Sequence, residues 1–296
     1  MADELDDGLL LDDNLVAYSG DEAGSDAEGD VKKEAAAPPK SDATEAKKRK
    51  RKAARQKKAA AYRDEVQAGQ SVAQQPSDRQ ADFLVAQQRK TYPKLSALEM
   101  QEMQVPATSL AETYAFTKER TLDHLAEFLR EYALRTPDDL QSAKPWMTEK
   151  GAPYILVVSG NAQRAADIAR PLRTLLPSDD ARPAKRRKGA SDDKGGAGVA
   201  KLFARHFKVD EQVAHLAEHP APLAVGTPHR IQQLLERSAL RTEHLAAVVV
   251  DHSWTDAKMR TIFDTPETHD ALVALLSEGA LRDAFRRKEP CKLVLY

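Results

Sequence analysis

A threonine-proline turn beside an arginine is the part of this sequence best suited to contacting a phosphate. Gly226, Thr227 and Pro228 follow a short apolar run, and Arg230 comes two residues later. A hydroxyl at the N-cap and a proline at the first helical position favour a helix start, whose free N–H groups attract anions. These four residues are therefore candidates for nucleic-acid binding. The alternative is a well-capped strand-to-helix connection without a ligand.

A lone carboxylate, Asp251, follows a second apolar run. An NTPase of the P-loop type would also need a glycine-rich turn with a lysine and a Ser or Thr hydroxyl. No Gly-x-x-x-x-Gly-Lys-Ser/Thr pattern occurs in the chain, and the single cysteine and scattered histidines show no metal-ligand spacing. We therefore predict no catalytic residue, no metal site and no cofactor.

Basic residues gather in two short clusters. The first cluster comprises Lys47, Lys48, Arg49, Lys50, Arg51 and Lys52, and the second comprises Lys185, Arg186, Arg187 and Lys188. The first follows a stretch that is acidic and has no Lys or Arg up to Asp30. Nuclear import is our first interpretation of it; a phosphate-binding arm and a solvated run are the alternatives. The second cluster is a weaker candidate for the same roles.

Two serines in the acidic stretch match the pattern of an acidic-directed kinase. Ser19 and Ser25 are each followed three residues later by a glutamate. Phosphate added there would make this part of the chain more negative. We list both as phosphorylation candidates.

Apolar runs alternate with amphipathic segments from residue 153 onward, which predicts an α/β fold with a parallel sheet and crossover helices. Strands are expected at residues 154–158, 222–225, 246–250 and 292–295, and helices at residues 162–176, 209–219, 228–237, 267–277 and 281–287. Upstream, Leu122, Leu125, Phe128, Leu129 and Tyr132 form the core-facing stripe of a further helix. Ser96 and Glu99 have capping-box spacing, which predicts a short helix toward Gln104.

Composition divides the chain into three parts. Residues 1–75 are too poor in large apolar side chains to fold alone, so we expect a disordered tail, acidic and then basic. Residues 76–114 are expected to form a helical extension. Residues 115–296 are expected to form the α/β domain, with a mobile basic loop at residues 177–198.

The order of these motifs resembles the first domain of DEAD-box RNA helicases. In that family a Thr-Pro-Gly-Arg turn precedes a helix, a strand and the Asp-Glu-Ala-Asp box, and here Thr227-Pro228-His229-Arg230 precedes Val250-Asp251. Arg164-Ala165-Ala166 resembles the family's Pro-Thr-Arg-Glu-Leu-Ala turn, which adds Arg164 to the RNA-binding candidates. Residues 116–121, in the place of the phosphate loop, have no glycine, and Asp251 alone remains of the box. The resemblance thus implies a degenerate domain.

A closer resemblance is to the CMS-type helicase-like subunits of the early small-subunit (90S) pre-ribosome. The motifs that carry it are Asp82-Phe83-Leu84, Gly151-Ala152-Pro153, Arg164-Ala165-Ala166-Asp167, Lys201-Leu202-Phe203-Ala204 and Gly226-Thr227-Pro228. This resemblance implies a single RecA-like parallel sheet with flanking helices, and a role in ribosome biogenesis in the nucleus and nucleolus.

We therefore expect a non-enzymatic, RNA-associated factor in early small-subunit assembly and rRNA processing. Its expected partners are pre-ribosomal RNA and early small-subunit pre-ribosome proteins, with no membrane and no small-molecule substrate. Two alternatives stay open. One is a divergent RNA-dependent NTPase or helicase that keeps Asp251 for a metal ion, and the other is a DNA- or chromatin-associated nuclear scaffold.

Overall fold

The computed structural model describes residues 71–140, 144–177, 198–205 and 207–296. These residues all belong to one compact unit of the chain, Lys52–Tyr296. Both basic clusters, Ser19 and Ser25, and nearly all of the predicted tail and loop lie outside the described residues.

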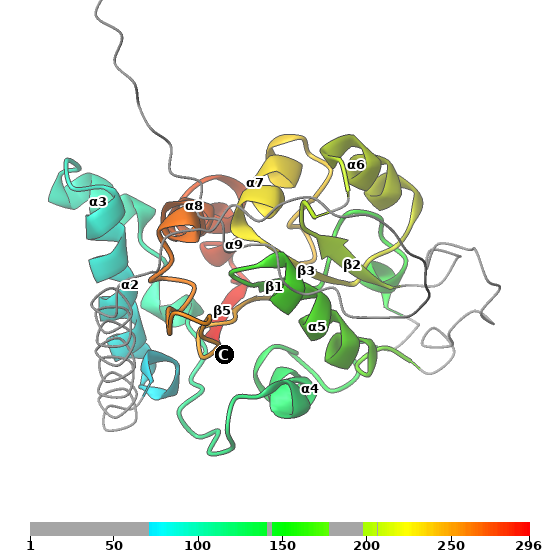
Figure 1. Cartoon of the computed structure of the whole chain (residues 1–296), viewed down its shortest axis with the longest axis horizontal. Coiled ribbons are helices and arrows are strands. Elements are labelled where there is room, and N and C mark those ends of the chain that lie inside the picture. Colours follow the sequence, from blue (N-terminus) through cyan, green and yellow to red (C-terminus); the bar gives the residue numbers. More distant parts are fainter. Residues whose placement is uncertain (1–70, 141–143, 178–197, 206) are drawn as a thin grey trace, which may run out of the picture. The chain divides into compact units, whose positions relative to one another are not determined.

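Five parallel strands form one sheet in the order β2-β3-β1-β4-β5 (Figure 1). The strands are β1 Ile155–Val158, β2 Val199–Leu202, β3 Leu223–Gly226, β4 Ala247–Val250 and β5 Lys292–Leu295. From the central β1 the chain builds β2 and β3 on one side and then crosses to β4 and β5 on the other. The predicted α/β fold with a parallel sheet is confirmed, and the strand order reverses between β1 and β4.

Eight α-helices of the described residues flank the sheet or extend it. They are α2 Ser77–Thr91, α3 Ala97–Met103, α4 Leu122–Tyr132, α5 Ala162–Arg173, α6 Val209–Glu218, α7 Pro228–Glu236, α8 Pro266–Ser277 and α9 Gly279–Phe285. The predicted capping box at the start of α3 is confirmed, because Ser96 N–H donates to Glu99 Oε2 at 2.8 Å and Glu99 N–H donates to Ser96 Oγ at 3.3 Å. Short 3-10 turns lie at Val72–Gln74, Ala107–Ser109 and Pro145–Met147.

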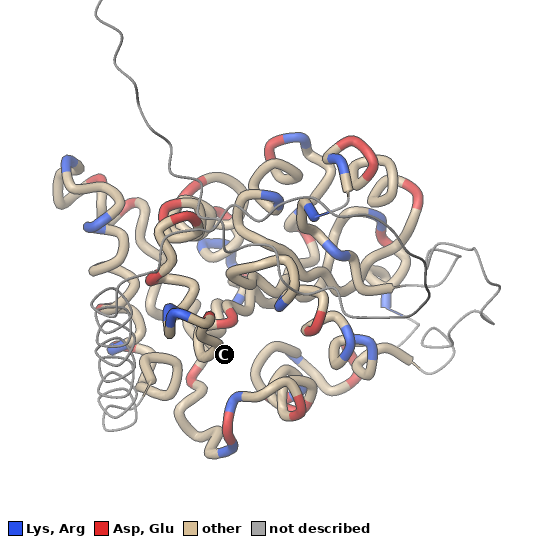
Figure 2. The backbone as a smooth tube through the Cα atoms, viewed as in Figure 1, with Lys and Arg blue, Asp and Glu red and all other residues tan. Residues whose placement is uncertain are grey.

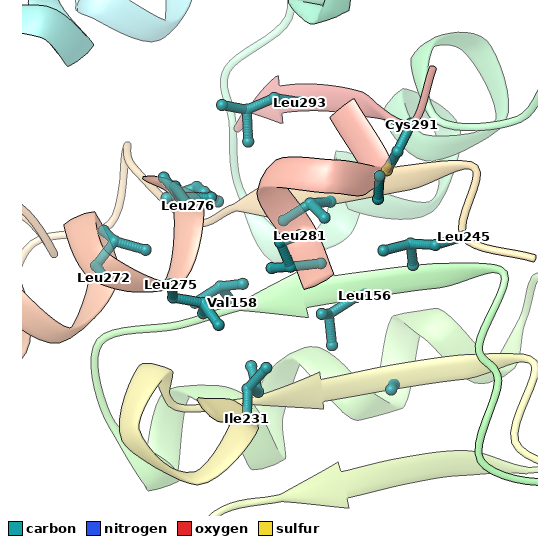
Figure 3. Packing of buried hydrophobic residues seen from close by; sticks show 14 of the residues in the cluster. Leu156, Val158, Ile231, Leu245, Leu272, Leu275, Leu276, Leu281, Cys291 and Leu293 are labelled. Carbon is teal, nitrogen blue, oxygen red and sulfur yellow. The ribbon is translucent and has the colours of Figure 1, made fainter. Parts of the chain in front are cut away.

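Apolar side chains cover both faces of the sheet. Alternate residues of β1 point to opposite faces, so Leu156 and Val158 join one core cluster while Ile155 and Val157 join the other. The first cluster contains Ile231 of α7 together with residues of α8 and α9, as Figure 3 shows. Helices α4 and α5 supply the second cluster. Burial on both faces explains why β1, β3 and β4 consist almost entirely of apolar residues.

Helix α2 packs against α8 and against the segment that follows β4. The ring of Phe83 meets Phe263 edge-on with centroids 5.2 Å apart, and Thr91 Oγ1 donates to Asp270 Oδ1 of α8 at 3.0 Å. Gln80 is fully buried and its Nε2 donates to Gln75 O at 2.7 Å. Apolar and polar contacts therefore hold α2 on α8 and on the segment that follows β4.

Candidate functional site

The carboxyl ends of parallel strands lie along one edge of a sheet, and ligands of such folds bind where the strand order reverses. Here that position is the crevice between β1 and β4. Ser159 follows β1 and Asp251 follows β4. Arg164 extends from the first turn of α5, where Asn161 caps the helix by accepting the Arg164 N–H at 2.7 Å.

An ion pair lies at the carboxyl ends of these two strands. Arg164 Nε donates to Asp251 Oδ2 at 2.8 Å, and Arg164 Nη2 donates to Asp251 Oδ1 at 3.0 Å. The two side chains are only 10% and 2% exposed. The guanidinium also lies 5.7 Å from the centre of the Trp254 ring. The carboxylate that could have held a metal ion is thus neutralised by a two-point contact with arginine.

The structure places the guanidinium of the RNA-binding candidate Arg164 in this ion pair. As an RNA-binding candidate it would need a guanidinium open to solvent, but the structure commits that group to Asp251 across the β1/β4 crevice. The sequence could identify both residues but not their pairing, because they lie on different strand-to-helix connections.

A second arginine occupies the segment in the place of the phosphate loop. Arg120 is buried, with Nη1 donating to Leu295 O at 2.5 Å and Nη2 donating to Thr113 O at 3.1 Å. Burial lowers the pKa of Arg120 to about 10, and its guanidinium lies 5.1 Å from the centre of the Phe128 ring. Residues 116–121 thus cover the carboxyl end of β5 and present no glycine-lined cradle. Sequence reasoning missed this role of Arg120.

His252, next to the lone carboxylate, faces the core. Its backbone N–H donates to Tyr296 O at 2.8 Å, and its ring contacts Phe83 edge-on with centroids 5.6 Å apart. Burial lowers the pKa of His252 to about 4. The imidazole is therefore neutral near pH 7 and is shielded from any ligand in solvent.

The Thr227 turn lies at the other half of the same edge, between β3 and α7. Thr227 occupies the N-cap, but its side chain makes no capping hydrogen bond; its backbone N–H donates to Leu202 O at 3.1 Å. A Cβ at Gly226 would lie 2.2 Å from Leu202 O. Gly226 is therefore explained by the close approach of β2, and Pro228 is buried. Thr227 is partly exposed, so of these three it is the one able to meet a ligand.

Arg230 is also placed differently from the expectation that it would add a charge for a phosphate. It is buried, and its Nη1 donates to Gln212 Oε1 at 2.8 Å and to Phe207 O at 3.0 Å. Burial lowers the pKa of Arg230. Because α7 buries Ile231 and Leu234 on the same side, helical periodicity turns Arg230 inward, toward the β2–α6 connection.

Neither a metal site nor a membrane span is found in the described ranges. Within residues 71–140, 144–177, 198–205 and 207–296, no three His, Cys, Asp or Glu side chains gather in a way that could hold a metal ion. No helix there has both the length and the apolar composition needed to cross a bilayer.

Comparison with known proteins places this geometry in a family. A family model described as "CMS1: U3-containing 90S pre-ribosomal complex subunit" matches residues 30–296. Protein CMS1 of Chaetomium thermophilum is 34% identical over 235 residues, which cover 78% of this chain and 85% of that protein. Human Protein CMSS1 is 29% identical over 200 residues, 67% of this chain and 61% of that protein.

Among solved structures, this chain is similar to a DEAD box protein from the hyperthermophile Methanococcus jannaschii. That similarity has 15% identity and a TM-score of 0.34, and covers 60% of this chain and 37% of that chain. It is too low to add to what the strand order shows. The family match, by contrast, spans all of the described residues: the chain belongs to the CMS1 family of U3-containing 90S pre-ribosomal complex subunits.

Proposed function

We propose that this ribosome biogenesis factor acts without ATP hydrolysis, as an RNA-associated docking subunit in early small-subunit assembly and rRNA processing. The observation that carries the proposal is the Arg164–Asp251 ion pair in the β1/β4 crevice. Family membership supplies the pre-ribosomal setting. The absence of enzymatic activity and the contact with RNA are the proposed parts.

The case against hydrolysis rests on what occupies the crevice. A metal-dependent NTPase needs a free carboxylate for Mg²⁺ and backbone N–H groups for phosphates. Here Arg164 binds both oxygens of Asp251, and the buried Arg120 covers the end of β5. Displacing Arg164 would leave its guanidinium buried without a partner, which opposes metal binding.

The case for docking rests on the opposite half of the edge. The β2–α6 connection and the Thr227 turn reach the surface there, with Arg205, Lys208 and His229 exposed. Pre-ribosomal RNA and early small-subunit pre-ribosome proteins are the proposed partners. We propose in addition that residues 76–114 serve as a helical extension of the α/β domain, residues 115–296.

A cellular replacement experiment separates docking from catalysis. The chain is replaced by the double variant Arg164→Met/Asp251→Leu, which removes both charges together and keeps the crevice filled. Docking predicts normal small-subunit rRNA maturation and normal recovery of pre-ribosomal RNA after crosslinking. Loss of maturation with a folded, pre-ribosome-bound variant would favour the NTPase alternative, and crosslinking to DNA in place of pre-ribosomal RNA would favour the chromatin scaffold.

We also propose that the chain acts in the nucleus and nucleolus and that the first basic cluster directs its import. A pre-ribosomal subunit needs access to the nucleolus, and a run of six consecutive basic residues, Lys47 to Lys52, suits an import receptor. Replacing the six with glutamine should move a fluorescent fusion toward the cytoplasm. The same change at Lys185 to Lys188 is the matched comparison, and unchanged nuclear fluorescence in the first variant would contradict the assignment. Phosphorylation at Ser19 and Ser25 remains a prediction for the same segment.

A further inference from the structure

Phe207 is an exposed aromatic side chain at the carboxyl edge of the sheet. It lies in the connection between β2 and α6 and is 45% exposed, whereas Phe203, four residues earlier, is buried. Among the described residues the other large apolar side chains with high exposure are Leu98 and Tyr114, which lie in or near the α2–α4 part of the chain. An exposed phenyl ring of this kind leaves apolar area in water unless a partner covers it.

Buried polar groups hold the backbone beneath this ring. Arg230 Nη1 donates to Phe207 O at 3.0 Å, and Gln212 Nε2 donates to Phe203 O at 3.1 Å. Arg230 and Gln212 also bond to each other, at 2.8 Å, and both are buried. These hydrogen bonds hold the backbone carbonyl groups of Phe203 and Phe207 in place, and Arg230 acts as the positioning residue of Phe207.

Two cationic residues flank Phe207 in the sequence. Arg205 and Lys208 are exposed, and neither is ion-paired with a carboxylate among the described residues. Arg205 Nη1 donates to the neutral Gln163 Oε1 at 2.5 Å. Glu211, three residues after Lys208, accepts the Lys208 backbone N–H at 3.0 Å at the start of α6, where the helix end offsets its charge.

Asp210, two residues after Lys208, is paired with Arg237. Exposed cations beside an aromatic ring are the two components of a surface that binds single-stranded nucleic acid, since phosphates meet the cations while a base stacks on the ring. A base-paired helix has its base faces already covered by neighbours.

We infer that Phe207 stacks on an unpaired RNA base while Arg205 and Lys208 contact the adjoining phosphates. The inference rests on the proposed RNA association and adds to it a site and a preference for single strands. Stacking of one base contributes about 1–3 kcal/mol by alanine substitution. This corresponds to a loss of about 5- to 150-fold in affinity when the ring is removed.

The test measures fluorescence anisotropy of a labelled oligouridylate of about 12 nucleotides, with the full chain at raised salt so that tail contacts are weakened. Phe207→Ala should lose affinity within the stated range, and Phe207→Trp should retain it. Tyr114→Ala, which removes an exposed aromatic ring elsewhere, is the matched control and should bind as the unchanged chain does. An oligomer of abasic sugar-phosphate units should bind the unchanged chain as weakly as oligouridylate binds Phe207→Ala.

Equal RNA affinity of Phe207→Ala and the unchanged chain, or equal binding of the abasic oligomer, overturns the stacking site but leaves RNA association standing. If the unchanged chain binds no RNA yet enters pre-ribosomes in a Phe207-dependent manner, the ring contacts a protein and the inference is wrong. Binding of neither RNA nor pre-ribosomes would instead refute the proposed function.

Discussion

The two halves of the carboxyl edge differ in what happens to their charged side chains. At the β1/β4 crevice the guanidinium of Arg164 is nearly buried and is paired with Asp251 through two hydrogen bonds. At the β2/β3 half, Arg205 and Lys208 are exposed to solvent, and the buried Arg230 donates to the backbone carbonyl of Phe207 between them in the sequence. A fold whose crevice is filled can still offer the rest of its edge to a partner. Within one sheet, the half that would bind a nucleotide is therefore occupied by an ion pair, whereas the proposed docking half has exposed cations.

The largest expected effect comes from breaking the crevice pair. Asp251→Ala leaves the Arg164 guanidinium, with 10% of its side chain exposed, without a countercharge. We expect the free energy of unfolding to fall by about 3–5 kcal/mol in urea titration, and by much less in Arg164→Met/Asp251→Leu. The control is Glu127→Ala, since the exposed Lys118–Glu127 pair should contribute at most about 1 kcal/mol. Equal effects of Asp251→Ala and Glu127→Ala would refute a structural role for the crevice pair.

A smaller effect is expected on the other half, from Gly226→Ala. The added Cβ would lie 2.2 Å from Leu202 O, so β2 must shift, and we expect a loss of about 1–3 kcal/mol in unfolding free energy. Gly160→Ala is the matched control, because its nearest neighbour would be Ile262 Cγ1 at 3.6 Å. If Gly226→Ala is as stable as the control but binds RNA more weakly, Gly226 serves ligand approach and our structural explanation is incorrect.

The smallest expected effect is a pH dependence of the unfolding free energy, caused by the buried side chain of His252. His252 has a pKa lowered to about 4 by burial, against an ordinary value near 6.5. Between these values the unfolded chain binds a proton that the folded chain does not, so stability falls as pH drops from about 7.5 to about 5. The contribution is about 1–2 kcal/mol.

His252→Phe removes this group while keeping an aromatic ring against Phe83. Urea titrations of both proteins at the two pH values isolate its contribution from that of the carboxylates. The unchanged chain should lose more stability toward pH 5 than the variant does. Parallel losses in the two proteins would show that His252 does not resist protonation.

The sequence predicted most of the strands and helices but few of the side-chain pairs. The apolar run at β5, Lys292–Leu295, was predicted to the residue, because buried parallel strands read as unbroken apolar segments. Strand β2 was missed, since it is a short edge strand with Lys201 inside it and follows a Gly-rich stretch.

The contacts of side chains were harder to predict than the helices and strands. Arg164, Arg230 and Asp251 were all selected as site residues, yet their partners lie 87 residues away for Arg164 and 18 for Arg230. Residue type and local spacing do not encode such distances. No sequence motif indicates Phe207. Its exposure is visible only once Phe203 and Leu202 are placed in the core.

Isothermal titration calorimetry of the full chain with Mg²⁺ and ATP tests the filled crevice most directly. The account predicts no saturable heat up to about 1 mM nucleotide, a concentration at which a site of even about −4 kcal/mol would be half occupied. The result should be the same for Asp251→Asn, and the same when oligouridylate is present. Saturable Mg²⁺-dependent ATP binding by the unchanged chain, abolished in Asp251→Asn, would contradict it.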